Sequence, residues 1–310
     1  MRLVEQLLNG EKRAAAKLIS LIEDEEAQAS EALAELYPHT GKAHIVGLTG
    51  PPGVGKSSLI NRLVREYRQG GKRVGVVAVD PTSPFTGGAV LGDRIRMADT
   101  GTDEGVFIRS MATRGYAGGL ALATFDAVKV LDAWGSDVVF VETVGAGQSE
   151  VEIASRAHTT VVVEMAASGD AVQALKAGIL EVGDVYAVNK ADQGGADATV
   201  SNLMFVLSGR KGWKPPVVPT SALEGTGIQQ LAKELERHRS YLASSGELER
   251  RERERARKEL FESVRRALSE RVESAHATSK TVERLVEAIV SREKDPRRAA
   301  AELLRAMRLR

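Results

Sequence analysis

The chain has 310 residues, and its 43 Lys and Arg side chains nearly balance 42 Asp and Glu, so its formal net charge at pH 7 is +1. A charge this close to zero argues against a protein that binds nucleic acid by bulk electrostatics. The chain lacks cysteine, which excludes disulfides, thiolate metal sites, iron–sulfur clusters and cysteine nucleophiles. It has no continuous apolar run of the roughly 18 residues that a membrane helix needs, and Glu5 and Glu11 are untypical of export or transit peptides. We therefore expect a cytoplasmic protein with no membrane span and no nucleic-acid partner.

Residues 1–42 are predicted to form a helical extension, in which Leu18 and Ile22 share one helix face and Pro38 follows the last helix. From residue 43 the pattern changes to short β-branched runs separated by helical segments. The runs are residues 43–50, 73–80, 105–111, 137–143, 159–166, 185–192 and 215–221, and the helical segments are 57–69, 118–134, 171–181, 196–208 and 227–238. Near-continuous apolar strands that alternate with helices predict an α/β domain over residues 43–240, with a mostly parallel sheet covered on both faces.

Residues 241–310 are predicted to form a charge-dense helical arm. From residue 247 to the end the chain has 18 basic and 13 acidic side chains, interleaved along the sequence. Leu260, Val264 and Leu268 recur at four-residue spacing, and a second apolar stripe runs through residues 282–290, as in amphipathic helices. Two interpretations stay open: surface helices that pack on the core, or an arm that binds a partner or a second copy of the chain.

The strongest motif is GPPGVGKSS at residues 50–58, which fits G-x-x-x-x-G-K-[ST] between a predicted strand and a predicted helix. Glycines in such a loop let backbone amides turn inward around phosphate oxygens, and the helix N-terminus adds positive potential. Lys56 is expected to bridge the β- and γ-phosphates, and the Ser57 hydroxyl is expected to ligate Mg²⁺. The predicted P-loop nucleotide site consists of Gly50, Pro51, Pro52, Gly53, Val54, Gly55, Lys56, Ser57 and Ser58.

Two later motifs point to guanine as the base. In NKAD at residues 189–192, Asp192 can accept hydrogen bonds from N1–H and the N2 amino group of guanine, a donor pair that adenine lacks. Asn189 is expected to bond guanine N7 or to hold the P-loop, and the stem of Lys190 to cover the base. After the next strand, a backbone amide of a third motif can reach guanine O6. The residues of that motif are Ser221, Ala222 and Leu223. Three motifs in this order predict GTP and GDP as the nucleotides.

Acidic residues at strand ends are expected to complete the Mg²⁺ site. Glu142 stands three residues before Gly145, where ordinary regulatory GTPases have Asp-x-x-Gly. We expect Glu142 to hold Mg²⁺ through water and the Gly145 amide to sense the γ-phosphate; a purely structural Glu142 is the alternative. Asp80 ends a strand in a position suited to outer-sphere Mg²⁺ binding. Asp93 lies in a Gly-rich stretch as a switch residue would, or caps a helix at 94–99. With Lys56, the candidate catalytic residues are Asp93, Glu142 and Gly145.

These motifs together resemble the MeaB-type GTPases, the methylmalonyl-CoA mutase-associated proteins, which include human MMAA and were once named ArgK or arginine/ornithine transport ATPases. The likeness is close over residues 1 to about 240, whereas the helical tail matches in character more than in motif. The segments that support it are GPPGVGKSS (50–58), VDPTSPFTGGAVLGDRIRM (79–97), RSMATRG (109–115), VETVGAGQSE (141–150), GDAVQALKAGILEVGDVYAVNKAD (169–192) and the late SAL (221–223).

The resemblance implies a G-protein chaperone of an adenosylcobalamin-dependent acyl-CoA mutase, with methylmalonyl-CoA mutase as the default partner. Such proteins couple GTP binding and hydrolysis to the loading of intact cofactor and the removal of damaged cofactor, and they look like homodimers joined through the C-terminal arm. By the family pattern, the Mg²⁺–phosphate site is Lys56, Ser57, Asp80, Asp93 and Glu142, and guanine is read by Asn189, Lys190 and Asp192. Asp170, Gln173 and Lys176 match an extra switch that responds to the mutase, although Asp170 can also serve as a helix N-cap.

No residue stands out as the group that positions the attacking water. Gln148 lies three residues after Gly145 rather than next to it. Arg109 and Arg114 are candidates for neutralising phosphate charge, and each can instead form a salt bridge. We therefore expect slow intrinsic hydrolysis that a partner accelerates.

Three other functions are weighed against this one. A nickel-insertion GTPase needs soft or imidazole ligands, but the chain has no cysteine and its five histidines are expected not to cluster. These histidines are His39, His44, His158, His238 and His276. An ATPase of kinase or partitioning type is disfavoured by Asp192 and by the lack of an additional Lys near the start of the P-loop. A scaffold that binds GTP only structurally is disfavoured by the predicted Mg²⁺ site.

Overall fold

The computed structural model describes residues 2–80, 102–112, 119–143, 155–166, 181–276 and 280–306. The chain forms two compact units, Met1–Glu249 and Arg250–Arg310. Within the described ranges, no helix combines the length and the apolar character that crossing a membrane would require.

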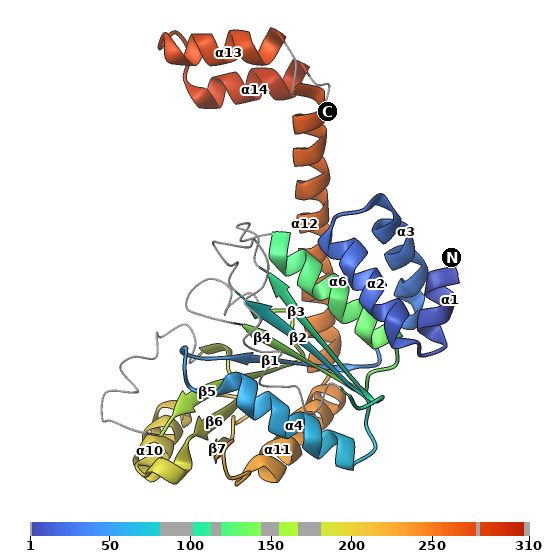
Figure 1. The fold of residues 1–310 in the computed structure, drawn as a ribbon. Coiled ribbons are helices and arrows are strands. Elements are labelled where there is room, and N and C mark those ends of the chain that lie inside the picture. The colour runs from blue at the N-terminus through green and yellow to red at the C-terminus, as the bar shows by residue number, and fades with distance from the viewer. Residues whose placement is uncertain are drawn as a thin grey trace. The chain divides into compact units, whose positions relative to one another are not determined.

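The first unit is built on a seven-stranded sheet in which every described strand pair is parallel. The strand order is β3-β2-β4-β1-β5-β6-β7 (Figure 1). The strands are β1 (His44–Thr49), β2 (Val74–Asp80), β3 (Val106–Ala112), β4 (Val138–Thr143), β5 (Thr159–Met165), β6 (Val185–Asn189) and β7 (Val217–Pro219). Each corresponds to one of the predicted β-branched runs. The predicted α/β fold with a mostly parallel, doubly covered sheet is therefore confirmed.

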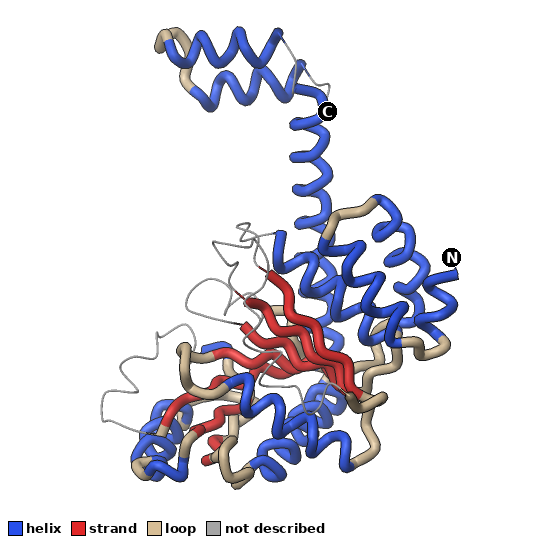
Figure 2. The backbone as a smooth tube through the Cα atoms, viewed as in Figure 1, coloured by secondary structure: helices blue, strands red, loops and turns tan. Residues whose placement is uncertain are grey.

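Helices cover both faces of this sheet (Figures 1 and 2). On one face, α6 (Gly119–Ala133) packs on β2, β3 and β4, and the N-terminal helices α2 (Lys12–Glu23) and α3 (Ala27–Leu36) pack against α6. Helix α1 (Arg2–Leu8) contacts α2, and the 3-10 turn η1 (Tyr37–His39) follows α3. The buried side chains Leu18 and Ile22 belong to the same core as Val139 and Val141 of β4. The N-terminal helices therefore share a hydrophobic core with the sheet.

The opposite face of the sheet is covered by α4 (Lys56–Gln69) and α11 (Ile228–Ser245), which contact each other. Val138 and Phe140 of β4 are buried on this side, because successive side chains of a strand point to opposite faces. On the other face, which α6 also covers, α10 (Ala196–Leu207) packs against β6 and β7, where Tyr186 and Val188 are buried. The 3-10 turn η2 (Ala191–Gln193) follows β6. The predicted helix 171–181 lies almost entirely outside the described residues.

Parallel strands place their carboxyl ends at a common edge of the sheet, where ligands of open α/β sheets bind. The P-loop follows β1, and the NKAD motif spans the end of β6 and the turn after it. Glu142 is near the end of β4, which lies between β1 and β2 in the sheet. This arrangement brings together motifs that are far apart in the sequence.

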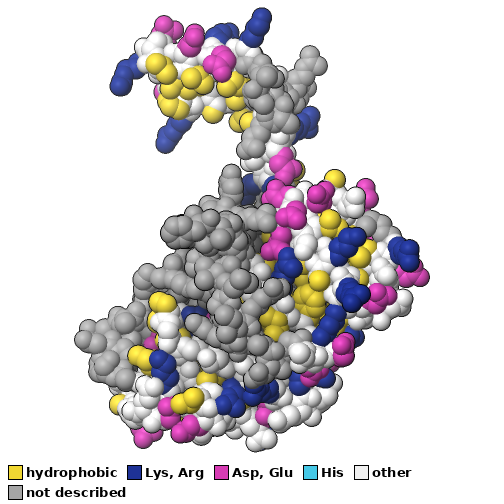
Figure 3. Space-filling model, in the orientation of Figure 1, with side chains coloured by type: hydrophobic (Ala, Val, Ile, Leu, Met, Phe, Trp, Pro, Cys, Tyr) yellow, Lys and Arg dark blue, Asp and Glu magenta, His cyan; other side chains and the backbone are white. Residues whose placement is uncertain are grey.

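The second unit contains most of α12 (Glu247–His276) and the hairpin of α13 (Lys280–Val290) and α14 (Pro296–Ala306). Within the hairpin, Leu285 and Ala299 are buried, and Arg284 forms an ion pair with Glu302 at 2.8 Å. Figure 3 shows apolar side chains gathered on one side of this hairpin. The exposed apolar side chains of the unit are Leu260, Phe261, Val264, Leu268, Val286, Val290 and Leu304.

Candidate nucleotide-binding site

The P-loop joins β1 to α4 through a turn that depends on glycine. Gly50, Gly53 and Gly55 have φ values of 141°, 79° and 94°, which L-residues with a side chain rarely adopt. A Cβ atom at Gly50 would lie 2.1 Å from the carbonyl oxygen of Val163 on β5. The loop therefore starts pressed against the neighbouring strand, and only glycine fits there.

Lys56 is folded back over this loop and buried. Its Nζ donates hydrogen bonds to the carbonyl oxygens of Gly50 at 2.7 Å and Pro51 at 3.0 Å. The ammonium group is thus held where it would meet the phosphates of a nucleotide seated on the amides at the N-terminus of α4.

Ser57 and Glu142 meet beside the P-loop although 85 residues separate them in the chain. The Ser57 hydroxyl donates to Oε1 of Glu142 at 2.8 Å, and both side chains are buried. A hydroxyl and a carboxylate oxygen in contact are the hard oxygen donors that Mg²⁺ prefers, so the two residues present fit this ion.

The structure does not describe the side chains of the other predicted phosphate-site residues. Asp80 ends β2, but its side chain lies outside the described residues. Asp93, Gly145 and the predicted switch also lie outside the described ranges, as do Arg114 and Gln148. The residues of that switch are Asp170, Gln173 and Lys176. Their roles stay predictions.

Asn189 links the P-loop to the turn that contains Ser221, Ala222 and Leu223. Its Nδ2 donates to the carbonyl oxygen of Val54 at 2.7 Å, and its Oδ1 accepts from the Ala222 amide at 3.1 Å. Of the two roles expected for Asn189, the structure thus contains the contact with the P-loop. The next residue, Lys190, has a left-handed backbone with φ 61° and directly precedes the turn η2 that contains Asp192.

A cavity of about 330 Å³ lies between α4, the NKAD motif and the turn of residues 221–223. It is lined by Gly55, Ser58, Asn61, Arg62, Arg65, Asn189, Lys190, Asp192, Gln193, Ala222 and Leu223. The structure therefore brings the predicted guanine-reading residues Asn189, Lys190 and Asp192 into one pocket with Ala222 and Leu223. The sequence interpretation missed the contribution of α4. Positions 58, 61, 62 and 65 follow the i, i+3, i+4, i+7 spacing of one helix face, so extending the helix from Ser58 would have found them.

Comparison with known proteins identifies the family. The family model described as methylmalonyl Co-A mutase-associated GTPase MeaB matches residues 15–277. This chain belongs to the MeaB family. The resemblance inferred from the sequence is thus confirmed.

Individual relatives agree with this assignment. A protein of Pyrococcus horikoshii named as a GTPase is 48% identical over 304 residues, which cover 96% of this chain and 95% of the relative. The methylmalonic aciduria type A homolog of Caenorhabditis elegans, a mitochondrial protein, is 32% identical and covers 85% of this chain and 72% of its own. A crystal structure described as an LAO/AO transport system kinase has the same fold, with a TM-score of 0.74 at 23% identity over 99% of this chain and 96% of its own.

The names of the relatives and the P-loop fold identify this MeaB-family chain as a GTPase that binds guanine nucleotide.

Arg109, a candidate for neutralising phosphate charge, forms an ion pair with Glu23 instead. Arg109 lies on β3, where its guanidinium contacts the Glu23 carboxylate and the Ser20 hydroxyl, 3.0 Å away, on α2. Of the two possibilities weighed for Arg109, this is the salt bridge.

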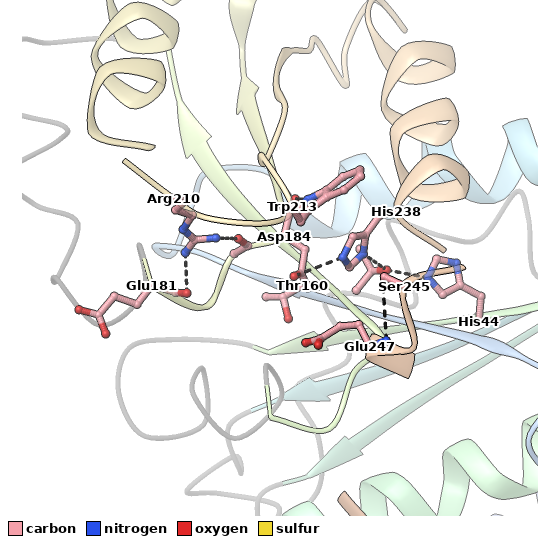
Figure 4. A network of polar contacts seen from close by, with 11 residues as sticks. His44, Thr160, Glu181, Asp184, Arg210, Trp213, His238, Ser245 and Glu247 are labelled. Atoms are coloured by element: carbon pink, nitrogen blue, oxygen red, sulfur yellow. Dashed lines mark hydrogen bonds and ion pairs between the residues drawn. The ribbon is translucent and has the colours of Figure 1, made fainter. Parts of the chain in front are cut away.

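The expectation that the histidines stay apart is wrong. His44 at the start of β1, His158 just before β5 and His238 on α11 form one buried group at the amino ends of the strands. Figure 4 shows His44 and His238 of this group. The reason is topological, because β1 and β5 are parallel neighbours and begin at the same edge. Thr159 joins two of them, with its Oγ1 2.7 Å from His44 Nε2 and 2.8 Å from His238 Nδ1.

This histidine group is a structural network and lies at the opposite end of β1 from the P-loop. His238 Nε2 is 3.4 Å from Oδ1 of Asp184, whose Oδ2 accepts the Thr160 amide at 2.9 Å. Within the described ranges, no group of three or more His, Asp or Glu side chains is arranged to hold a metal ion. The clustering therefore gives no support to a nickel site.

A buried acid lies close to the P-loop and was also missed. Glu164 on β5 follows Val163, the residue that contacts Gly50, and is 4% exposed. Burial raises the pKa of Glu164 from 4.5 to about 7, against the opposing effects of the Met165 amide and the positive charge of Lys56. A charged residue within an apolar strand was the available signal, because TTVVVEMA has Glu where a buried strand favours an apolar side chain.

Proposed function

We propose that this chain is a Mg²⁺-dependent GTPase that acts as a chaperone for an adenosylcobalamin-dependent acyl-CoA mutase, with methylmalonyl-CoA mutase as the first candidate. The observation that supports the Mg²⁺ dependence is the 2.8 Å contact between Ser57 and Glu142 beside a P-loop lysine. The family description and the name of the C. elegans relative support the mutase.

In this proposal the P-loop binds GTP through backbone amides, and Lys56 leaves its carbonyl partners to bridge the β- and γ-phosphates. Ser57 would ligate Mg²⁺, and Glu142, Asp80 and Asp93 would supply the acidic groups that hold it. Mg²⁺, when bound, neutralises charge that develops on the phosphate oxygens. Water attacks the γ-phosphorus while the bond to the β–γ bridging oxygen breaks, which yields GDP and phosphate. Catalysis here is positioning and charge stabilisation, and the Gly145 amide senses the γ-phosphate.

We further propose that hydrolysis is slow until the mutase binds, and that Asp170, Gln173 and Lys176 transmit that binding. A homodimer formed through the helical arm is part of this proposal, and the exposed apolar side chains of α12 support it.

The partner is tested by affinity capture from native lysate, with the full chain held by a non-hydrolysable GTP analogue and a GDP-loaded sample as the control. We expect a cobalamin-dependent mutase in the first sample, identified by mass spectrometry, and an increase in GTP turnover when that mutase is added. Gln173→Ala and Lys176→Ala are expected to reduce the increase and to keep the unstimulated rate. The proposal is wrong if no mutase is captured and turnover is already fast without one.

A further inference from the structure

The turn that faces the guanine pocket is held by a residue of the P-loop helix. Arg62 lies on α4, and its guanidinium reaches residues 221–223, about 160 positions later in the chain. Its Nε donates to the carbonyl oxygen of Ala222 at 2.7 Å, and an Nη donates to the carbonyl oxygen of Leu223. Two donors of one planar, permanently charged group thus meet two successive carbonyls, a geometry that lysine cannot reproduce.

Asn189 holds the same turn from the other side. Its Oδ1 accepts the amide of Ala222 at 3.1 Å, while its Nδ2 donates to the Val54 carbonyl in the P-loop at 2.7 Å. Ala222 is therefore fixed at both its amide and its carbonyl. The contacts of Arg62 and Asn189 form a closed ring through the P-loop, α4, the end of β6 and the turn.

The turn also has internal hydrogen bonds that do not involve Arg62. The Gly225 amide donates to the Ser221 carbonyl at 2.8 Å, and the Ser221 amide donates to the Thr226 carbonyl at 3.0 Å. The Glu224 amide is satisfied by the Ser221 hydroxyl at 3.1 Å. These bonds close the turn on itself, so the contribution of Arg62 is to set where the turn lies relative to α4.

We propose that Arg62 is a positioning residue for guanine recognition, which holds residues 221–223 where a backbone amide reaches guanine O6. The inference rests on the proposed guanine site and assigns the recognition of different guanine atoms to different residues. Recognition of O6 depends on Arg62 through the turn, whereas recognition of N1–H and the N2 amino group depends on Asp192. Since Arg62 is part of the P-loop helix, base recognition is mechanically tied to the helix that receives the phosphates.

The test measures the affinity of Arg62→Gln for three nucleotides by calorimetry: GDP, 6-thio-GDP, which replaces O6 with a weaker acceptor, and IDP, which keeps O6 but lacks the N2 amino group. We expect GDP to bind about tenfold more weakly, since a lost charge-assisted hydrogen bond has roughly this effect. The preference for GDP over 6-thio-GDP should shrink several-fold, because the amide no longer meets O6. The preference for GDP over IDP should stay as in the wild type.

Two further variants keep the test decisive. Arg68→Gln removes a guanidinium from the same helix at a site that contacts Asp103 and the Lys72 carbonyl instead, and it should leave all three affinities unchanged. Arg62→Lys should recover part of the lost preference, since an ammonium can reach one of the two carbonyls. Urea unfolding tests whether each variant is folded. If Arg62→Gln does not fold, the nucleotide preferences of Arg62→Lys decide the test.

Arg62 has no positioning role if Arg62→Gln keeps the wild-type affinities, or if its two preferences change together, which indicates general loosening. A wild-type chain that binds GDP and IDP equally would contradict the guanine assignment of Asp192, and the role of Arg62 with it. A wild-type chain that discriminates, together with an unchanged Arg62→Gln, contradicts the role of Arg62 alone.

Discussion

At the scale of single residues, two ionisable side chains near the P-loop, Lys56 and Glu164, are buried, where a charge is costly. Lys56 is buried, and its ammonium group donates to two backbone carbonyls. Glu164 is paired in register with the apolar Val188 of β6, and among the described residues Lys56 is the charged group that acts on it. A carboxyl with a raised pKa is neutral in the folded chain over a range where the unfolded chain ionises it.

We predict that Glu164 lowers the stability of the nucleotide-free protein as the pH rises. Between the unfolded pKa of 4.5 and the folded value of about 7, the folded state binds more protons than the unfolded state, so its stability falls across this window. Glu164→Gln removes this term and should be more stable than the wild type at about pH 8, by roughly 1 to 3 kcal/mol. Urea unfolding from about pH 5 to about pH 8 measures it.

The matched control for this prediction is Glu181→Gln, an exposed carboxylate, which should keep the wild-type slope. If Glu164→Gln and the wild type lose stability in parallel over the same pH range, the carboxyl is not the cause.

Asp192 gives a second prediction at this scale. Its carboxylate lines the pocket beside Lys190 and can accept from two guanine donors. An amide in its place offers a donor where xanthine has a C2 carbonyl oxygen. Asp192→Asn should bind GDP at least about tenfold more weakly and prefer XDP. Competition binding with both nucleotides measures the shift, and unchanged GDP affinity would refute the assigned base contact.

At the scale of elements, the histidine network joins the beginnings of β1 and β5 to α11, the helix that precedes the arm. His44 is buried against His158, and its ring lies 2.7 Å from Thr159 Oγ1. Burial lowers the pKa of His44 well below 6.5, and the positive potential of His158, Arg239 and His238 acts in the same direction. The neutral ring is therefore the form that the fold accommodates.

We predict that this network makes the first unit sensitive to acid. Below pH 6.5 the unfolded chain takes up a proton at His44 that the folded chain refuses, so the free energy of unfolding falls as the pH drops. His44→Gln, which can still bond Thr159, should flatten this part of the stability profile. The measurement is the urea midpoint from about pH 5 to about pH 7, with His39→Gln, an exposed histidine, as the control. An unaltered acid limb in His44→Gln would exclude the network as its origin.

At the scale of the whole molecule, the two units divide the chain's properties between them. The cavity lined by the predicted guanine-reading residues and the described part of the P-loop both belong to Met1–Glu249. The second unit is rich in arginine and exposes Leu260, Phe261, Val264 and Leu268 on one side of α12, at 62%, 59%, 45% and 42% of their full exposure. A row of large apolar side chains along a helix is typical of a protein contact surface.

We predict that these side chains form the dimer contact and that nucleotide binding does not need it. We expect the wild type to be a dimer by light scattering and the double variant Leu260→Glu/Val264→Glu to be monomeric, with the GDP affinity of the wild type. Arg250→Glu, also on α12, is the control for added charge and should stay dimeric. A monomeric wild-type chain would show that the arm serves another contact.

A feature could be predicted from the sequence when the residues that determine it are close together along the chain. Strands, most helices, the P-loop and the NKAD motif were predicted with boundaries within a few residues, because each is set by neighbouring residues: apolar runs, glycines with positive φ, or a short motif at a strand end. The family also followed from such segments, since the motifs are local and their order is sequential.

Only the tertiary structure decided which distant residues meet. The Ser57–Glu142 contact, the Arg62 contacts with Ala222 and Leu223, and the histidine group all depend on strand order and helix placement. No pattern along the chain encodes the order β3-β2-β4-β1-β5-β6-β7 directly, because it results from how the whole apolar surface is buried. The local sequence therefore determined that this protein binds guanine nucleotide at strand ends, and the packing of the sheet and its helices decided which side chains surround it.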